Sequence, residues 1–306
     1  MGSGSRCRRV EDECQRIAWR GAAPGAEVMN DGTALRDASA MKTFLVSLTR
    51  DADRRAAIVR RFPAMSAAFE WVDATDGRTL PASNYFARCA PAFRERTILL
   101  SPSEVGCALS HMDAYARFLA SDAQVALFLE DDVEGTDADL ERIARLASAL
   151  NGEFFLACGG QDGLRSRRWL IGQRLCSPDG IDYYRINRHA YGQLWRTCCY
   201  VMTRCVARRM LARQTALLGR ADEWEALLRD FDGAAYFVDA LAHPLDLSAS
   251  AIESERVASG GPAAEPRIGR VADRIAALFR KRRIYRSMLL AQLGRLGGHE
   301  TILRKR

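Results

Sequence analysis

The sequence lacks the features that mark membrane-spanning, secreted and disulfide-stabilised proteins. No run approaches the roughly 20 apolar residues that a transmembrane helix needs. Acidic Glu11, Asp12 and Glu13 stand where a signal peptide would have its apolar region. The nine cysteines are odd in number and lack paired C-x-x-C spacing, which argues against a disulfide framework and a zinc site. We therefore expect a cytoplasmic protein whose thiols are small buried apolar groups.

Size and composition indicate a chain that folds around a large core. Its 306 residues are 48% hydrophobic and 27% charged, enough for one large or two modest domains, which excludes disorder throughout. The formal charge of +7 is unevenly spread. Residues 267–306 hold twelve Arg or Lys and two acids, a net +10, so residues 1–266 carry −3. The basic character therefore belongs to the C-terminal tail.

The tail has more than one interpretation. An apolar stripe at helical spacing runs through Ile268, Val271, Ile275, Leu278 and Phe279. Arg267, Arg270 and Arg274 form a second stripe, so we predict a basic helix that lies on an anionic membrane leaflet or packs on the folded domain. Aromatic residues are sparse between its arginines, and we expect no nucleic-acid partner.

The pattern along the chain predicts an α/β domain with a mostly parallel central sheet flanked by helices. Residues 1–40 show no lasting hydrophobic period, so we predict a disordered extension there, a folded domain over 41–255 and a basic helical tail over 256–306. Strand-like 43–48, a helix to about residue 62 and strand-like 69–74 form a β-α-β unit. Further strands are predicted at 125–129, 154–158, 199–202 and 235–240.

Two other segments have clear local signals. Ser101-Pro102-Ser103-Glu104 matches a capping box with Pro at the first helical position, and it predicts a helix that continues to about Leu119. The region from Gly160 to Tyr191 is rich in Gly, Arg and aromatic residues and has poor periodicity. We predict that this region is a long loop that shapes a binding site.

A carboxylate cluster at the end of one predicted strand is the strongest functional signal. The apolar run from Val125 to Leu129 leads directly into Glu130-Asp131-Asp132. Ligands of open α/β sheets bind at the carboxyl ends of strands. Clustered carboxylates raise one another's pKa, and a divalent cation relieves that repulsion; oxygen ligands favour Mg²⁺ or Mn²⁺. The alternative is a solvated acidic loop that caps the following helix.

Seven short motifs follow one another between about Met41 and Ser254. They are Phe44-Leu45-Val46-Ser47-Leu48 with Asp53-Arg54-Arg55, Asp73-Ala74-x-Asp76-Gly77, Glu104-Val105-Gly106-Cys107-Ala108-Leu109-Ser110-His111, Glu130-Asp131-Asp132-Val133, Tyr200-Val201-Met202-Thr203, Asp222, and His243-Pro244. In this order they resemble glycosyltransferase family 25, bacterial lipooligosaccharide glycosyltransferases whose better-known members are β-galactosyltransferases. The resemblance implies a GT-A type nucleotide-sugar-binding fold, a UDP-sugar donor, a divalent metal and a lipooligosaccharide acceptor.

The resemblance also indicates which residues hold the metal. We expect Asp132, backed by Glu130 or Asp131, to bind Mn²⁺ or Mg²⁺, where the ion stabilises negative charge on the departing diphosphate. A GT-A site commonly takes a further ligand from late in the chain, and His243 is the candidate. The alternative for His243 is an ordinary loop histidine.

An inverting transfer needs a carboxylate that takes the proton of the acceptor hydroxyl. Asp222 falls where the family has its acid, and Glu223 is the substitute. The alternative is that Asp222 is only the N-cap of the helix that follows.

The remaining predicted contacts to the sugar nucleotide are Arg54, Asp73, Asp76, Gly77, Glu104, His111, Glu130 and Asp131. Glu104 and His111 lie seven residues apart, which places them near one face of the capped helix. Their alternatives are a capping glutamate and a buried packing histidine. For Arg54 the alternative is a solvated arginine at a helix start.

The main hypothesis is an enzyme, a UDP-sugar-dependent hexosyltransferase. It moves a hexose, with galactose favoured, to a lipooligosaccharide or LPS core acceptor with metal assistance and inversion. We expect it in the cytoplasm, peripheral at the inner face of the bacterial inner membrane, with a lipid-linked oligosaccharide as partner. The alternatives are a nucleic-acid-binding protein that acts through the basic tail, and a two-carboxylate metal-dependent phosphohydrolase.

Overall fold

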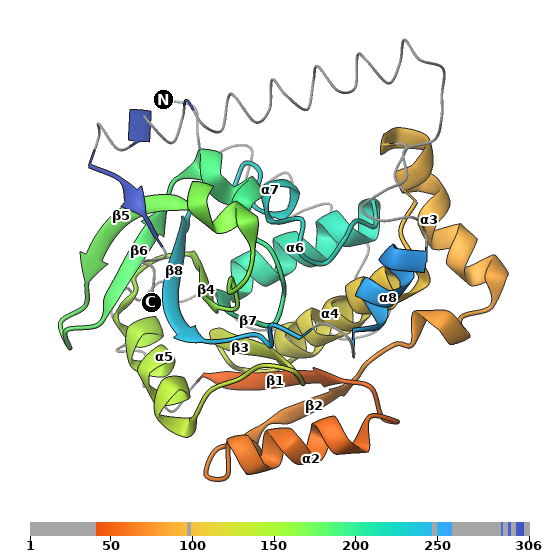
Figure 1. The fold of residues 1–306 in the computed structure, drawn as a ribbon, viewed down its shortest axis with the longest axis horizontal. Coiled ribbons are helices and arrows are strands. Elements are labelled where there is room, and N and C mark those ends of the chain that lie inside the picture. Colours follow the sequence, from red (N-terminus) through yellow and green to blue (C-terminus); the bar gives the residue numbers. More distant parts are fainter. Residues whose placement is uncertain are drawn as a thin grey trace, which may run out of the picture. The chain divides into compact units, whose positions relative to one another are not determined.

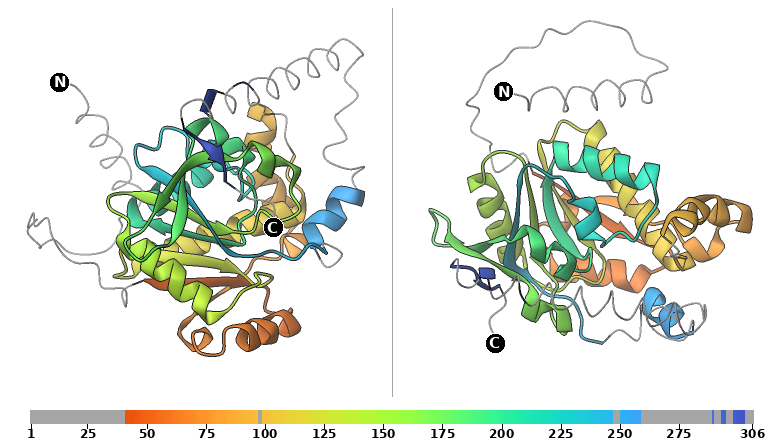
Figure 2. Two further views of the ribbon diagram at one scale, coloured as in Figure 1. Left: turned by 60° about the vertical axis from the view of Figure 1, so that its left-hand side comes forward. Right: turned by 90° about the horizontal axis from the view of Figure 1, so that it is seen from above.

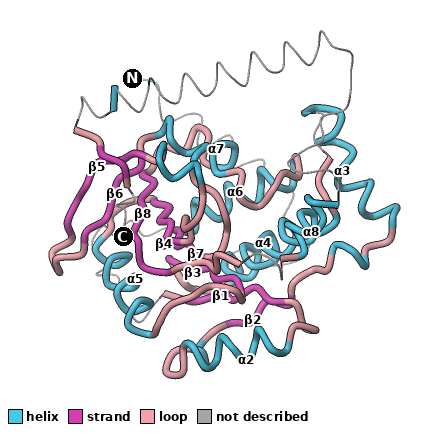
Figure 3. The backbone as a smooth tube through the Cα atoms, viewed as in Figure 1, coloured by secondary structure: helices cyan, strands magenta, loops and turns pink. Residues whose placement is uncertain are grey.

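The computed structural model describes residues 41–96, 99–246, 250–258, 289, 293–294 and 298–302. The predicted extension over 1–40 and the predicted helical stripes of the tail lie outside these residues. Within the described part, nine strands form one sheet in the order β2-β1-β3-β7-β4-β8-β6-β5-β9 (Figure 1, Figure 3). The strands are β1 Lys42–Ser47, β2 Glu70–Asp73, β3 Val125–Glu130, β4 Phe154–Gly159, β5 Ile171–Cys176, β6 Asp182–Ile186, β7 Cys199–Thr203, β8 Ala234–Leu241 and β9 Glu300–Thr301.

Helices cover both faces of the sheet (Figure 2). They are α2 Ala52–Arg61, α3 Ala82–Arg96, α4 Pro102–Ala120, α5 Asp137–Ala149, α6 Arg204–Ala216, α7 Trp224–Leu227 and α8 Ala251–Ala258, with short 3₁₀ turns that include η3 Gly77–Thr79. Side chains of α4, α6 and α7 pack in the core on one face, and those of α2 and α5 in the core on the other. The predicted α/β class with helices flanking a central sheet is confirmed.

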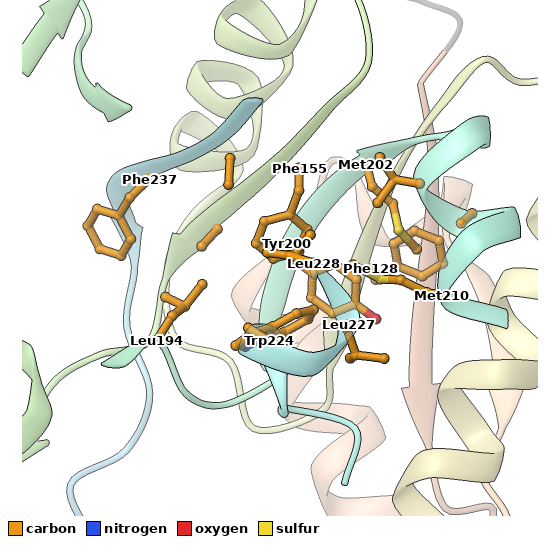
Figure 4. Packing of buried hydrophobic residues seen from close by; sticks show 14 of the residues in the cluster. Phe128, Phe155, Leu194, Tyr200, Met202, Met210, Trp224, Leu227, Leu228 and Phe237 are labelled. Atoms are coloured by element: carbon orange, nitrogen blue, oxygen red, sulfur yellow. The ribbon is translucent and has the colours of Figure 1, made fainter. Parts of the chain in front are cut away.

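The buried strand β3 shows why an uninterrupted apolar run forms in the centre of this sheet. Val125, Leu127 and Leu129 face the core under α2 and α5, while Ala126 and Phe128 face the other core. A strand covered on both faces needs apolar residues at every position. Phe128 stacks on Tyr200 of β7 with ring centroids 5.2 Å apart, and Figure 4 shows this aromatic layer.

The sheet is mixed, which corrects the prediction of mostly parallel strands. β1 runs parallel to β2 and β3, and β4 runs parallel to β8. β7, however, lies antiparallel between β3 and β4, and β6 is antiparallel to both β5 and β8. The chain between β4 and β7 contains strands and short 3₁₀ turns but no long helix, so it makes no βαβ crossover.

The region Gly160 to Tyr191 is not the long loop that was predicted. It contains the β5–β6 hairpin, which turns through Ser177–Gly180, where Gly180 has a φ of +75°. Pro, Asp and Gly are typical of such a turn. The hairpin extends the sheet toward β9 and lies away from the cleft described below.

The other predicted strands and helices are confirmed within a few residues. The capping box is also present: the Ser101 hydroxyl accepts from the Glu104 backbone N–H at 3.3 Å, and the Glu104 carboxylate accepts from the Ser101 N–H at 2.9 Å. Part of the predicted tail belongs to the sheet, since β9 pairs with β5 and Ile302 is buried. Among the described helices, none has the length and apolarity to span a membrane.

Candidate functional site

Several strands end at one edge of the sheet, and a cleft of about 650 Å³ opens there. Val46 near the end of β1 pairs with Glu130 at the end of β3. Because β7 is antiparallel to β3, its first residues lie at the same edge, and the Glu130 N–H donates to the carbonyl of Cys198 at 2.9 Å. β8 ends at Leu241, and His243 follows at the cleft. The carboxylate cluster therefore lies at a site-forming edge.

A close crossing between the loop after β2 and helix α4 builds one wall of the cleft. A Cβ on Gly77 would lie 1.7 Å from the carbonyl oxygen of Pro102, and a Cβ on Gly106 would lie 2.5 Å from that of Thr75. Ser110 links the two elements, since its hydroxyl accepts from the Thr75 N–H at 2.8 Å and donates to the Gly106 carbonyl at 2.7 Å. The two glycines are therefore required for backbone contact.

Arginine–carboxylate pairs line the side of the cleft formed by β1 and β2. Arg54 donates to Oδ1 of Asp131 at 2.8 Å, and Asp76 pairs with Arg50 and Arg78. Burial raises the pKa of Asp131, while hydrogen bonds from Ser47 and Arg54 act in the opposite direction. Arg54 is thus not a solvated helix-start arginine.

Glu130 is held by a group of donors at the back of the cleft. Its Oε1 accepts from Nε2 of His111 at 2.9 Å and from the Thr197 hydroxyl at 2.6 Å. Burial opposes ionisation of Glu130, but the interactions with His111 and Thr197 outweigh it and hold the pKa of Glu130 below its usual value. Glu130 is therefore a fixed, ionised carboxylate.

Asp132 and His243 lie next to each other at the cleft, and no hydrogen lies between them when Asp132 is ionised. Nδ1 of His243 lies 2.8 Å from the carbonyl oxygen of Pro244, which can only accept, so this nitrogen carries the hydrogen. Nε2 is then a lone-pair donor, and it lies 3.5 Å from Oδ2 of Asp132. Burial, and after it the charge of Arg196, lower the pKa of His243 and favour this neutral form.

The geometry of this pair fits a divalent cation. Oδ1 of Asp132 is buried and has no hydrogen-bond partner. Burial, followed by the charges of Glu130 and Asp131, raises the pKa of Asp132 to about 7. A cation between the Asp132 carboxylate and the His243 nitrogen would satisfy both groups, and hard Mn²⁺ or Mg²⁺ accepts oxygen ligands.

Asp222 lines the cleft, whereas Glu223 does not. Oδ2 of Asp222 accepts from the backbone N–H of Arg196 at 3.2 Å. Helix α7 has Glu223 at its N-cap position, so Asp222 lies one residue before the cap. Glu223 pairs with Arg96 at 3.1 Å.

The other predicted residues divide between the cleft and its surroundings. Asp76, Gly77, Glu104 and Asp131 line the cleft with Arg54 and Glu130. His111 is 1% exposed and lies behind Glu130. Asp73 is exposed, pairs with Arg55 at 2.6 Å and is not among the lining residues.

Three further residues that line the cleft, Arg196, Thr197 and Arg220, were not predicted from the sequence. Arg196 has a φ of +66°, unusual for a residue with a side chain, and its guanidinium donates to the carbonyls of Gly160 and Asp162 at 2.7 and 2.9 Å. These contacts fix the segment just before β7, where the backbone N–H of Arg196 donates to Asp222. A strained backbone leaves no pattern in a single sequence.

Comparison with known proteins relates the chain to one family. The sequence profile of glycosyltransferase family 25 (LPS biosynthesis protein) matches residues 40–223. The chain is 33% identical over 112 residues to a probable inactive glycosyltransferase 25 family member 3 of Rattus norvegicus, and 32% identical over 110 residues to the inactive glycosyltransferase 25 family member 3 of Mus musculus. Each match covers 34% of this chain and 19% of the relative, so the chain spans about a fifth of the length of these curated relatives.

Similarity to solved structures is more distant. A mannose-1-phosphate geranyltransferase from Thermus thermophilus matches with 16% identity and a TM-score of 0.35, covering 67% of this chain and 74% of the other. A glucosyl-3-phosphoglycerate synthase from Mycobacterium tuberculosis matches with 12% identity and a TM-score of 0.37, covering 77% and 88%.

Proposed function

The chain belongs to glycosyltransferase family 25, and from this premise we propose that it transfers a hexose, with galactose favoured, from a UDP-sugar to a lipooligosaccharide or LPS core acceptor. The observation that supports this most is the pair formed by Asp132 and His243. A buried carboxylate oxygen without a partner faces a histidine whose free lone pair lies 3.5 Å from the other oxygen. In a site for sugar nucleotides, such a pair serves to hold Mn²⁺ or Mg²⁺.

The reaction needs stabilisation of the negative charge that develops on the leaving diphosphate. A divalent cation held by Asp132 and His243 would supply it as a Lewis acid. The chain itself contributes the arginines Arg50, Arg54, Arg196 and Arg220 along the cleft, which offer donors for phosphate oxygens. The size of the cleft, about 650 Å³, suits a nucleotide sugar.

Asp222 is the proposed base of an inverting transfer. It lines the cleft, and the Arg196 N–H fixes one of its oxygens at 3.2 Å. In the proposed step its carboxylate accepts the proton of the acceptor hydroxyl as that hydroxyl attacks the sugar and the UDP leaves. Glu223 remains the less favoured candidate because it pairs with Arg96 outside the lining residues.

The test is an assay of sugar transfer from UDP-galactose and other UDP-hexoses to lipooligosaccharide acceptors with Mn²⁺ present. We expect Asp222→Asn to lower kcat by about 10²-fold or more while UDP affinity changes little, because the base acts in the transition state. Glu223→Gln is the matched control and should keep most of the activity.

Two results would reject the proposal. One is metal-dependent phosphate release from simple esters with no transfer to any acceptor, which would favour the phosphohydrolase alternative. The other is a wild-type chain that binds neither UDP nor Mn²⁺. Transfer that survives in Asp222→Asn but not in Glu223→Gln would reassign the base.

A further inference from the structure

Three donors converge on a single oxygen of Glu130. Oε1 receives hydrogen bonds from His111 at 2.9 Å, from the Thr197 hydroxyl at 2.6 Å and from the Cys107 thiol at 3.9 Å. The Glu130 side chain is 23% exposed and lines the cleft two residues before Asp132. A carboxylate that is anchored through one oxygen keeps a fixed orientation at the cleft.

Behind His111 a hydrogen-bonded chain runs into the core. Nδ1 of His111 lies 2.7 Å from the Tyr200 hydroxyl, which lies 2.8 Å from the Tyr115 hydroxyl. All three side chains are 1% exposed. One arrangement of hydrogens satisfies every group: Tyr115 donates to Tyr200, Tyr200 donates to Nδ1, and Nε2 donates to Glu130. Tyr200 packs in the aromatic layer against Phe128 (Figure 4). Because Tyr200 is held there, its hydrogen bond fixes the orientation of the His111 ring.

We propose that His111 and Thr197 are positioning residues for the divalent cation. They hold the charge of Glu130 beside Asp132, and thereby raise the affinity of the Asp132–His243 pair for the ion without touching it. This inference rests on the proposed cation site. Removing a group that orients a metal ligand in this way typically lowers metal affinity by about 10–100-fold.

A rival explanation exists for the same residues. The ligand atoms of Cys107, His111 and Glu130 lie within 4.8 Å of one another, which is compatible with a zinc site. The hydrogen bonds favour the positioning role, because the contact between His111 and Glu130 is already at hydrogen-bond length and Tyr200 occupies the other ring nitrogen. The group is complete without an ion.

Thr197 offers the sharpest test because two substitutions separate its hydroxyl from its shape. Thr197→Val keeps the volume and removes the donor, whereas Thr197→Ser keeps the donor. The dissociation constant of Mn²⁺ is measured by calorimetry on the full chain without nucleotide, and stability is measured by urea unfolding without metal. We expect Thr197→Val to weaken Mn²⁺ binding about tenfold and Thr197→Ser to stay within about threefold of wild type.

Variants of the hydrogen-bonded side chains behind Glu130 give a second test. His111→Phe removes the donor to Glu130, and His111→Gln keeps an N–H at a similar reach. We expect at least about tenfold weaker Mn²⁺ binding in His111→Phe, rescue to within about threefold in His111→Gln, and little change in Tyr115→Phe, the far end of the chain. A purely structural role would lower the urea midpoint of His111→Phe and Tyr115→Phe and leave the Mn²⁺ constant unchanged.

Two outcomes would overturn the inference. Mn²⁺ affinity equal to wild type in both Thr197→Val and His111→Phe would show that Glu130 needs no positioning. Stoichiometric Zn²⁺ binding, lost in Cys107→Ser, would establish the rival metal site. If instead the Mn²⁺ constants follow the expected order and no sugar transfer is found, the proposed reaction fails while this inference stands.

Discussion

At the scale of single residues, Asp132 has an environment unlike that of a free carboxylate in water. One oxygen of its carboxylate is buried and lacks a hydrogen-bond partner, and two further carboxylates lie next to it in the chain. The neighbouring acids each have their own donors: Arg54 bonds Asp131, and His111 and Thr197 bond Glu130. Of these three acids, Asp132 is the one that needs an added cation to be stable when ionised.

This predicts a stability that depends on pH in an unusual direction. The pKa of Asp132 is about 7 in the folded chain and about 3.8 in the unfolded one, so the folded state binds more protons between these values. Stability therefore falls as pH rises from about 4 to about 7, by about 2 to 4 kcal/mol for this group alone. Without metal, Asp132→Asn should match wild type near pH 4 and exceed it in the free energy of unfolding at pH 8.

Urea unfolding at the two pH values, with and without Mn²⁺, measures this effect. Mn²⁺ should raise the stability of wild type at pH 8 and leave Asp132→Asn unchanged, because an ion that binds only the folded state stabilises it. A variant that is less stable than wild type at pH 8 without metal would show that Asp132 is not a destabilising charge.

The residue scale also shows what one sequence can predict about a site. Glu130, Asp131 and Asp132 were predictable because an apolar run ends in acids, which is a local pattern. Arg196 and Thr197 were not, since their place at the cleft depends on the antiparallel return of β7 and on a strained backbone. His111 was predictable as a site residue or a packing residue, and the structure places it behind the cleft as the buried partner of Glu130.

At the scale of elements, the contact between helix α4 and the loop after β2 holds the cleft together. Gly106 of α4 and Gly77 of η3 bring the two backbones into contact, and Ser110 bonds across them. In an exposed helix a change from Gly to Ala stabilises by about 1 kcal/mol. Here the added methyl group would meet backbone atoms at 2.5 and 2.6 Å, and backbone cannot move aside cheaply.

We therefore predict that Gly106→Ala destabilises the chain by about 1 to 3 kcal/mol, the range of overpacked sites. Urea unfolding measures the change in the free energy of unfolding, and a loss of stability is the expected result. A gain in stability would mean that the crossing is loose and that the glycine is not required there.

The elements differ in how far the sequence predicts them. The capping box, the strand β3 and the first β-α-β unit follow from local patterns and were predicted close to their observed bounds. The β5–β6 hairpin was missed because its Gly, Arg and aromatic residues obscure the alternation of a strand, although its turn residues were visible. The direction of β7 has no local signal, because it depends on what connects it to β4.

At the scale of the whole molecule, charge is divided unevenly along the sequence. Residues 267–306 carry a net +10, and the rest of the chain carries −3. The tail also supplies β9 and the buried Ile302, so deleting it would remove part of the fold. Neutralising charges is therefore a cleaner test than truncation.

Changing Arg280, Lys281, Arg282 and Arg283 to Gln should weaken sedimentation with vesicles of anionic phospholipid by about tenfold or more, since each basic side chain contributes about 1 kcal/mol near such a surface. Binding to neutral vesicles and transfer to a detergent-dispersed acceptor should change little. Equal sedimentation of wild type and variant would indicate that the tail packs on the domain instead.

The central claim is that Asp132 and His243 hold a divalent cation that in turn binds the diphosphate of a sugar nucleotide. Calorimetric titration of UDP into the full chain, with and without Mn²⁺, tests it in wild type and in Asp132→Ala. The account predicts UDP binding to wild type only when Mn²⁺ is present, and none to Asp132→Ala under either condition. UDP affinity in Asp132→Ala equal to that of wild type would contradict it.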